Sequence, residues 1–186
     1  MKKEVTTTVK KANRLSIIIL ISLIFISSLI FIFGWDKEFI EKEYIQKSSN
    51  LVILSLVIYP ILLILGIIIH ELIHGLFFSI FCDNKTKSIE FGILLKKLAP
   101  YCHCKEWLYI NEYKISIIMP LLILGVIPFL LGCITKSLYI LLISIILITG
   151  CSGDIIIFWI LGGLKSNTKV KDHDKKVGCI IRNNDI

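Results

Sequence analysis

Four long apolar runs dominate the pattern of hydrophobic and polar positions along the chain. Each is near or above the ~20 residues that a helix needs to cross the hydrocarbon layer of a membrane. They cover residues 15–34, 51–82, 115–135 and 137–164. The pattern predicts an all-α transmembrane fold: a four-helix polytopic bundle that forms a single membrane domain over residues 1–186, with residues 165–186 as a polar tail.

The loop between the second and third runs has a different pattern. Residues 88–97 and 101–109 are rich in β-branched and aromatic side chains, and Pro100 lies between them. Two short strands joined by a turn at Pro100 are the predicted structure, a small β-hairpin close to the membrane surface. An amphipathic helix at the interface is the alternative for the same segment.

Composition supports a membrane protein and excludes several other classes. The chain is 55% hydrophobic and 19% charged, with a mean hydropathy of +0.82. Soluble domains contain roughly 45–50% apolar and about 25% charged residues. Disordered, collagen-like and secreted disulfide-rich classes do not fit this composition. The net charge of +7 lies beside the apolar runs, which indicates contact with a lipid bilayer and no nucleic-acid partner.

The distribution of lysine and arginine predicts the orientation in the membrane. Seventeen of the 21 basic residues precede the first run, lie in the loop 83–114, or follow the last run. The loop 35–50 has three lysines outnumbered by acidic residues, and the turn at Lys136 has one. The positive-inside rule therefore predicts a multi-pass protein of the cell membrane, with both termini and the loop 83–114 in the cytoplasm.

Candidate chemistry centres on the H-E-x-x-H segment at residues 70–74. On a helix, His70 and His74 lie one turn apart on the same face, so both imidazoles can reach one metal ion. Glu71 lies beside the first histidine, where a carboxylate can accept a proton from water at the metal. The alternative is a set of polar residues that only form hydrogen bonds between helices.

Asp154 is the candidate third ligand. A catalytic zinc site usually has three protein ligands and one open position. Asp154 is the only acidic residue inside the apolar runs besides Glu71, and in the predicted topology it lies at a depth similar to that of the two histidines. The alternative for Asp154 is a protonated carboxyl group that forms a hydrogen bond to a neighbouring helix.

Two further histidines compete less well for a metal. His103 lies between Cys102 and Cys104, but three adjacent residues cannot easily close a tetrahedron around one ion. We expect this segment to belong to the loop strand beside the site. His173 lies in a polar tail, where we expect it to be exposed to solvent. The thiols on the cytoplasmic side are expected to be reduced.

Four segments in order resemble a known family. They are HELIHG, YCHCKEWL, GCSGDIIIFWILGGL and VKDHDKKVGC. Together they resemble the zincin peptidases, a family of small bacterial membrane proteins first catalogued as a domain of unknown function. The layout is similar to that of the site-2 proteases, which are intramembrane metalloproteases. The resemblance implies that His70, His74 and Asp154 bind zinc and that Glu71 is the catalytic base, although site-2 proteases usually carry the aspartate in a different local sequence.

These observations predict a membrane-embedded zinc metalloprotease. Its expected substrates are membrane proteins or membrane-proximal peptides, with Zn²⁺ as cofactor. Small residues of the fourth run, among them Gly150, Ser152 and Gly153, are expected to let it approach the second run closely. Two alternatives stay open. One is a non-catalytic metal-binding adaptor, in which Glu71 is dispensable, and the other is a metal transporter, which needs ligands along a route to both faces.

Overall fold

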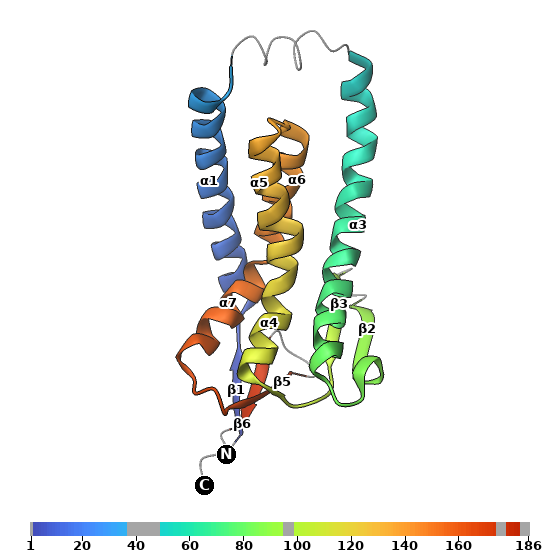
Figure 1. Cartoon of the computed structure of the whole chain (residues 1–186), viewed down its shortest axis with the longest axis vertical. Helices are drawn as coiled ribbons and strands as arrows, with labels where there is room; N and C mark the ends of the chain where they lie inside the picture. Colours follow the sequence, from blue (N-terminus) through green and yellow to red (C-terminus); the bar gives the residue numbers. More distant parts are fainter. Residues whose placement is uncertain (1, 37–48, 95–98, 174–177, 183–186) are drawn as a thin grey trace.

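The computed structural model describes residues 2–36, 49–94, 99–173 and 178–182. Long helices run along the length of the molecule, and the strands gather at one end of it (Figure 1). The helices described are α1 Val9–Gly34, α3 Ser49–Phe81, α4 Ile110–Pro120, α5 Ile127–Ile134, α6 Leu138–Gly150 and α7 Ser152–Ile160. A π-helical segment, Leu121–Val126, connects α4 to α5. Most of the predicted loop 35–50, with three of its lysines, lies outside the described residues.

Three helical stretches are long and apolar enough to cross a membrane. They are Lys10–Gly34, Leu56–Phe81 and Ile110–Ile134. Large aliphatic and aromatic side chains point away from the molecule along these helices, among them Phe25 and Ile32 of α1 and Ile64 of α3. In water such exposure is unfavourable, whereas lipid tails accept it. The helices are thus compatible with a membrane protein.

The fourth apolar run is broken, although the sequence predicted one continuous span over residues 137–164. Helix α6 ends at Gly150, and α7 starts at Ser152 with its axis bent by 48°. Side chains from α1 satisfy polar groups at this break. The hydroxyl of Ser16 lies 2.7 Å from the Ser152 hydroxyl and 3.3 Å from the Thr149 carbonyl oxygen. Because the break interrupts helical hydrogen bonding, such a donor stabilises it.

Close helix packing depends on other glycines than the sequence suggested. The expected contacts of Gly150 and Gly153 with the second run are wrong, because a Cβ atom at either position would meet nothing within 4 Å. A Cβ atom at Gly66 of α3 would instead lie 2.8 Å from Leu147 Cδ2, and one at Gly125 would lie 2.6 Å from Ile148 Cγ1. The second and third apolar stretches therefore approach α6 through their own glycines.

The prediction of an all-α fold is wrong, because the protein contains two antiparallel sheets. One is the two-stranded pair β2 (Ile89–Leu94) and β3 (Ala99–Cys104). The other has the strand order β1-β6-β5-β4, with β1 Lys2–Thr6, β6 Gly178–Arg182, β5 Lys169–Asp172 and β4 Leu108–Tyr109. The segment interpreted as a polar tail supplies the two central strands. Its strands are short, and their pairing with the N-terminus depends on contacts distant in sequence, which local patterns do not reveal.

The hairpin between the second and third apolar runs is present, but its turn is not at Pro100. Pro100 lies within β3 and pairs with Ile93, and the connection at residues 95–98 lies outside the described residues. The amide of Lys105 donates to the Ser88 carbonyl on the β2 side. Backbone amides alternate in direction along a strand, so the nitrogen of Pro100 faces away from β2. Proline therefore costs this hairpin no hydrogen bond.

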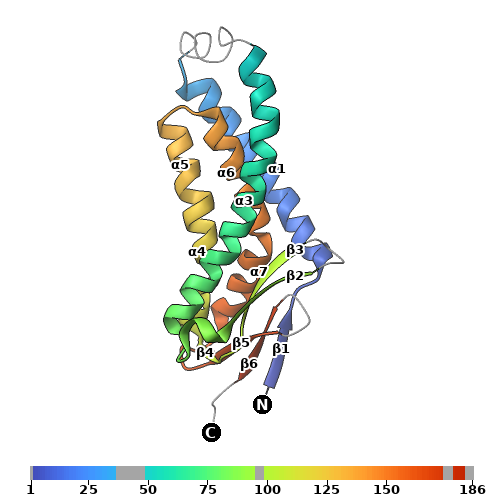
Figure 2. The same cartoon turned by 90° about the vertical axis from the view of Figure 1, so that its right-hand side faces the viewer.

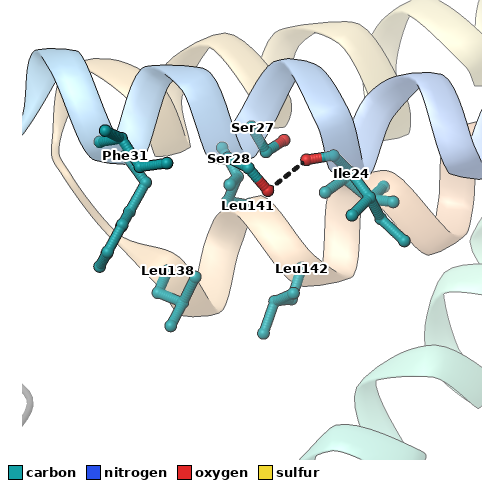
Figure 3. Close-up of a pocket in the computed structure, with 9 residues that line it drawn as sticks. Ile24, Ser27, Ser28, Phe31, Leu138, Leu141 and Leu142 are labelled. Carbon is teal, nitrogen blue, oxygen red and sulfur yellow. Dashed lines mark hydrogen bonds between the residues drawn. The ribbon is translucent and has the colours of Figure 1, made fainter.

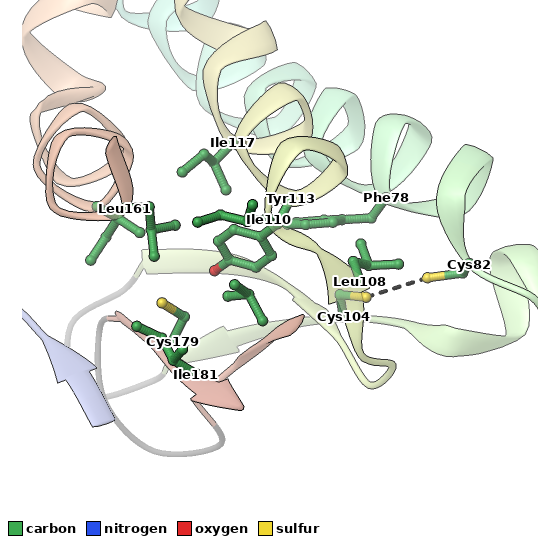
Figure 4. Packing of buried hydrophobic residues seen from close by; sticks show 12 residues of the cluster. Phe78, Cys82, Cys104, Leu108, Ile110, Tyr113, Ile117, Leu161, Cys179 and Ile181 are labelled. Atoms are coloured by element: carbon green, nitrogen blue, oxygen red, sulfur yellow. Dashed lines mark hydrogen bonds between the residues drawn. The ribbon is translucent and has the colours of Figure 1, made fainter. Parts of the chain in front are cut away.

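Both sheets lie at the end of the helical bundle where the first and last strands meet (Figure 2). The main buried cluster fills the space between the four-stranded sheet and the ends of α3, α4 and α7. Figure 4 shows Tyr113 in the middle of this cluster, beside Ile110 and Phe78 and above Cys179. This core lies at the sheet end of the bundle and holds the four-stranded sheet against the helices that carry Glu71 and Asp154.

Candidate metal centre

The two histidines of the H-E-x-x-H segment face each other on α3. The Nε2 atoms of His70 and His74 are 3.1 Å apart, and the rings meet edge to face with centroids 4.7 Å apart. Nδ1 of His74 lies 3.0 Å from the backbone carbonyl oxygen of Ser116 on α4. A carbonyl oxygen can only accept, so Nδ1 of His74 carries the proton. In the neutral form of this ring, Nε2 is therefore the nitrogen with a free lone pair, which can bind a cation.

Asp154 meets these histidines from the first turn of α7. Its Oδ2 atom is 3.3 Å from His70 Nε2, and its Oδ1 atom is 3.6 Å from His74 Nε2. The break at Cys151 makes this arrangement possible, because it starts a new helix just before Asp154. Unpaired amides and the helix dipole favour a carboxylate in the first turn of a helix. Asp154 remains 26% exposed, whereas His74 is buried.

The three side chains fit a zinc ion. Ligand atoms about 2.0–2.1 Å from zinc at tetrahedral angles lie about 3.3–3.4 Å from one another. His70 Nε2 lies near that distance from both His74 Nε2, at 3.1 Å, and Asp154 Oδ2, at 3.3 Å. The other carboxylate oxygen, Oδ1, is 3.6 Å from His74 Nε2. In the part of the chain that the structure describes, this is the only group of three such residues whose ligand atoms lie within 4.8 Å of each other. Two imidazoles and a carboxylate are a donor set that zinc prefers.

Glu71 lies between this group and the hairpin. The backbone amide of Cys102 on β3 and the charges of His70, His74 and Asp154 are near enough to act on its carboxylate. Backbone amides alternate in direction along a strand, and the nitrogen of Pro100 faces away from β2. The amides of Cys102 and Cys104 therefore face away from β2 as well. The structure therefore places Glu71 against the open edge of β3, beside the metal group.

The structure does not bring His103 into the metal group. Its Nδ1 atom lies 3.9 Å from Oδ2 of Asp172. The neighbouring Cys104 is buried, with its Sγ atom 3.3 Å from that of Cys82. This agrees with the expectation that the Cys102–Cys104 segment belongs to a strand beside the site.

The expectation that His173 is exposed to solvent is wrong. Its side chain is only 10% exposed, and its Nε2 atom lies 3.4 Å from Oε2 of Glu4. Its backbone amide donates to the Gly178 carbonyl. These contacts arise because the tail folds back as β5 and β6, next to the N-terminal strand.

A buried carboxyl group that sequence reasoning missed connects the sheet to the site. Asp172 accepts a hydrogen bond from the Tyr113 hydroxyl and another, 2.7 Å long, from the Cys104 amide. Burial raises the pKa of Asp172, and the hydrogen bonds from Cys104 and Tyr113 oppose that shift. Asp172 thus binds one outward amide of β3, that of Cys104, and Glu71 lies near the other, that of Cys102. The sequence signal for this group was weak. Asp172 lies in a short polar segment of the tail, and its buried position becomes apparent only once that segment pairs as β5.

Glu106 holds the end of α3 against the hairpin. It accepts hydrogen bonds from the backbone amides of Asp83 and Asn84, at 2.9 and 3.1 Å, and a short one from the Ser88 hydroxyl. Hydrogen bonds from the Ser88 hydroxyl, from the side chain and backbone amide of Asn84, and from the backbone amide of Asp83 lower the pKa of Glu106 to about 2. This carboxylate caps the turn that leads from the metal-site helix into β2.

A cavity elsewhere in the bundle has no such chemistry. It measures about 360 Å³ and lies between α1 and α6. Figure 3 shows aliphatic side chains such as Leu138 and Leu142 around it, and the Ser28 hydroxyl turned back to the Ile24 carbonyl of its own helix. Its lining contains no acidic or histidine side chain, so the candidate site is the group on α3 and α7.

Comparison with known proteins agrees with this geometry. A family model described as "Putative zincin peptidase" matches residues 63–168. That range contains His70, Glu71, His74 and Asp154, together with the hairpin. No curated protein and no solved structure matches the chain. Because the match covers more than half of the 186 residues, the chain belongs to the zincin peptidase family.

Proposed function

We propose that this protein is a membrane-embedded zinc metallopeptidase of the site-2-protease type. His70, His74 and Asp154 hold the zinc ion, and Glu71 is the catalytic base. The observation that carries the proposal is the convergence of three ligand atoms within 4.8 Å of one another, with Glu71 next to them. Membership of the zincin peptidase family supports a metallopeptidase at the level of reaction class.

Each residue has a defined task in peptide hydrolysis. A zinc ion supplies Lewis acidity, which lowers the pKa of water and polarises a carbonyl group. Glu71 takes the proton from the attacking water and passes it to the leaving amine. The Ser116 carbonyl keeps His74 in the tautomer that leaves Nε2 free. The backbone amide of Cys102 lies near the Glu71 carboxylate.

The substrates we propose are membrane proteins or peptides close to the membrane. His70 and His74 lie within Leu56–Phe81, one of the stretches that are apolar enough to cross a bilayer, so a scissile bond must reach membrane depth. The hairpin β2–β3 lies alongside α3 at the end of the bundle that carries both sheets (Figure 2). The excess of basic residues at that end supports a cytoplasmic location for the termini and the hairpin.

The adaptor and the transporter explain less of the site. A transporter needs ligands along a route to both faces, whereas the described residues hold one group of three ligands. A silent adaptor gives Glu71 no task, although Glu71 lies beside the metal group in a half-buried position. The adaptor and the peptidase therefore differ in one property, which is whether Glu71 is needed for peptide cleavage.

The test is a cleavage assay on purified protein in detergent. Wild type and Glu71→Gln, each loaded with zinc, are incubated with a library of peptides from membrane proteins, and new N-termini are counted by mass spectrometry. The amide keeps the size of the side chain but cannot take a proton from water, so cleavage should fall about 10²–10⁴-fold. Zinc content should remain unchanged. Equal cleavage by both proteins would remove Glu71 from the mechanism, and no cleavage by the wild type would favour the adaptor.

A further inference from the structure

Pro120 interrupts the hydrogen bonding of α4 at one specific carbonyl. In an α-helix, the amide of each residue donates to the carbonyl four positions earlier. Proline has no amide hydrogen, so the Ser116 carbonyl receives no such bond from Pro120. The next amide, that of Leu121, donates to the Ile118 carbonyl instead. The Ser116 carbonyl is thereby left available to an outside donor.

The donor that uses this carbonyl is a proposed zinc ligand. His74 Nδ1 lies 3.0 Å from the Ser116 oxygen, and Ser116 is fully buried. A buried carbonyl without a partner is unfavourable, so the pairing stabilises both groups. The hydroxyl of Ser116 is occupied elsewhere, since it donates to the Glu112 carbonyl at 2.9 Å. Of the two oxygen atoms of Ser116, the backbone carbonyl oxygen is therefore the one that pairs with His74.

We propose that Pro120 is a positioning residue of the metal site. By withholding an amide hydrogen from the Ser116 carbonyl, it reserves that carbonyl for His74 and keeps Nδ1 protonated. Nε2 of His74 then faces Nε2 of His70 and the Asp154 carboxylate with a free lone pair. This inference rests on the proposed function, since it assigns His74 as a ligand. It also assigns a cause to the orientation of His74, namely the absent amide hydrogen of Pro120 on α4.

Two variants at position 120 distinguish the effect of the absent amide hydrogen from the effect of the proline ring. Pro120→Ala restores an amide that can donate to the Ser116 carbonyl and compete with His74. Pro120→lactic acid, introduced by nonsense suppression, has the same side chain as alanine, but an ester oxygen replaces the N–H group. Pro128→Ala is the matched control, because it restores an amide in the same apolar stretch, eight positions further along.

The measurement is zinc affinity of the full-length protein, determined by competition with a chelator. We expect Pro120→Ala to bind zinc about 10–100-fold more weakly than wild type, as is usual when the outer partner of a ligand is lost. The ester variant and Pro128→Ala should bind as wild type does. Equal affinity of Pro120→Ala and wild type would overturn the inference while leaving the zinc site intact. Failure of the wild type to bind zinc would instead overturn the proposed function.

A spectroscopic readout distinguishes positioning from a purely structural effect of the helix. With four histidines in the chain, ¹⁵N-histidine labelling gives an assignable spectrum. The hydrogen-bonded Nδ1–H proton of His74 should be present in wild type and the ester variant, and weakened or shifted in Pro120→Ala. If Pro120→Ala does not fold, the ester variant decides. An ester variant with wild-type zinc affinity and an unchanged Nδ1–H signal supports the inference. An ester variant that loses the affinity or the signal would show that the proline ring, and not the missing amide hydrogen, positions His74.

Discussion

Oδ2 of Asp154 lies 3.3 Å from Nε2 of His70, although the two residues are on separate helices far apart in sequence. The contact depends on the break at Cys151, which ends α6 and places Asp154 in the first turn of α7. A continuous helix would give Asp154 no free helix terminus beside it. The position of the proposed third ligand thus depends on the break between α6 and α7.

Replacement of Asp154 should remove zinc without preventing folding. Asp154→Ala deletes one of the three proposed ligands, and Asp154→Asn keeps the shape but removes the charge, so both should bind zinc at least 10-fold more weakly. Zinc is measured in purified protein by elemental analysis after dialysis. His103→Ala is the control and should keep wild-type zinc, because His103 lies against Asp172. Full zinc in the Asp154 variants with loss in the His103 variant would move the third ligand to the hairpin.

The orientation of the chain in the membrane is tested by thiol labelling at exposed positions. Native Cys179 is fully buried and cannot report, so single cysteines are introduced at Thr135 and Ser166 in a Cys133→Ser background. Thr135→Cys should react with a membrane-impermeant reagent on intact cells. Ser166→Cys should react only after permeabilisation, because basic residues gather on the cytoplasmic side. The opposite labelling pattern would reverse the topology.

The carboxylate of Glu106 predicts a pH-dependent contribution to stability. Its pKa is lowered from the ordinary 4.5 to about 2, so its stabilising effect is complete above pH 4.5 and is lost as the pH falls through 2. Glu106→Gln should lower the free energy of unfolding at pH 7 by about 1 kcal/mol, since water weakens these exposed hydrogen bonds. That amounts to roughly 2–4 °C in Tm.

The measurement for Glu106 is thermal unfolding in detergent from pH 7 to pH 2.5. The difference between wild type and Glu106→Gln should shrink as the pH falls. Glu90→Gln is the matched control, because Glu90 forms an exposed ion pair with Lys105 at 2.7 Å, and loss of an exposed pair should leave stability almost unchanged. A Glu106 effect that stays constant over this range contradicts the assignment.

The sheet formed by the two ends of the chain depends on Gly178. Its φ angle is +146°, and a Cβ atom there would lie 2.2 Å from the Val5 carbonyl oxygen of β1. Gly178→Ala should therefore weaken the β1–β6 pairing and destabilise the protein by about 1–3 kcal/mol. Hydrogen exchange of the β1 amides measures the effect. Gly162→Ala has open space around it and should leave that exchange unchanged, so equal rates in both variants would refute the role of Gly178.

Local sequence patterns predicted the elements that depend on local physics. Long apolar runs must become helices in a membrane because backbone groups need internal partners there, and α1 and α3 follow from that. The spacing of His70 and His74 requires only one turn of helix. The depth argument for Asp154 also agrees with the structure, since its carboxylate reaches both histidines.

What the sequence did not reveal depends on contacts between distant segments. The strands β5 and β6 are stabilised by pairing with β1 and β4, and each alone is too short for a strong pattern. The break at Cys151 and the buried Asp172 become visible only once these segments are packed. The role of the Ser116 carbonyl had a signal, namely Pro120 four residues later, but its partner His74 lies on another helix.

The central claim is that this chain carries a zinc ion on the two histidines of α3 and Asp154 of α7. Zinc content of purified wild-type protein, measured by elemental analysis beside His70→Ala, tests it most directly. The account predicts about one zinc per wild-type chain and a strongly reduced content in His70→Ala, with both proteins folded. A wild type without zinc, or a His70→Ala variant that keeps the full content, would contradict it.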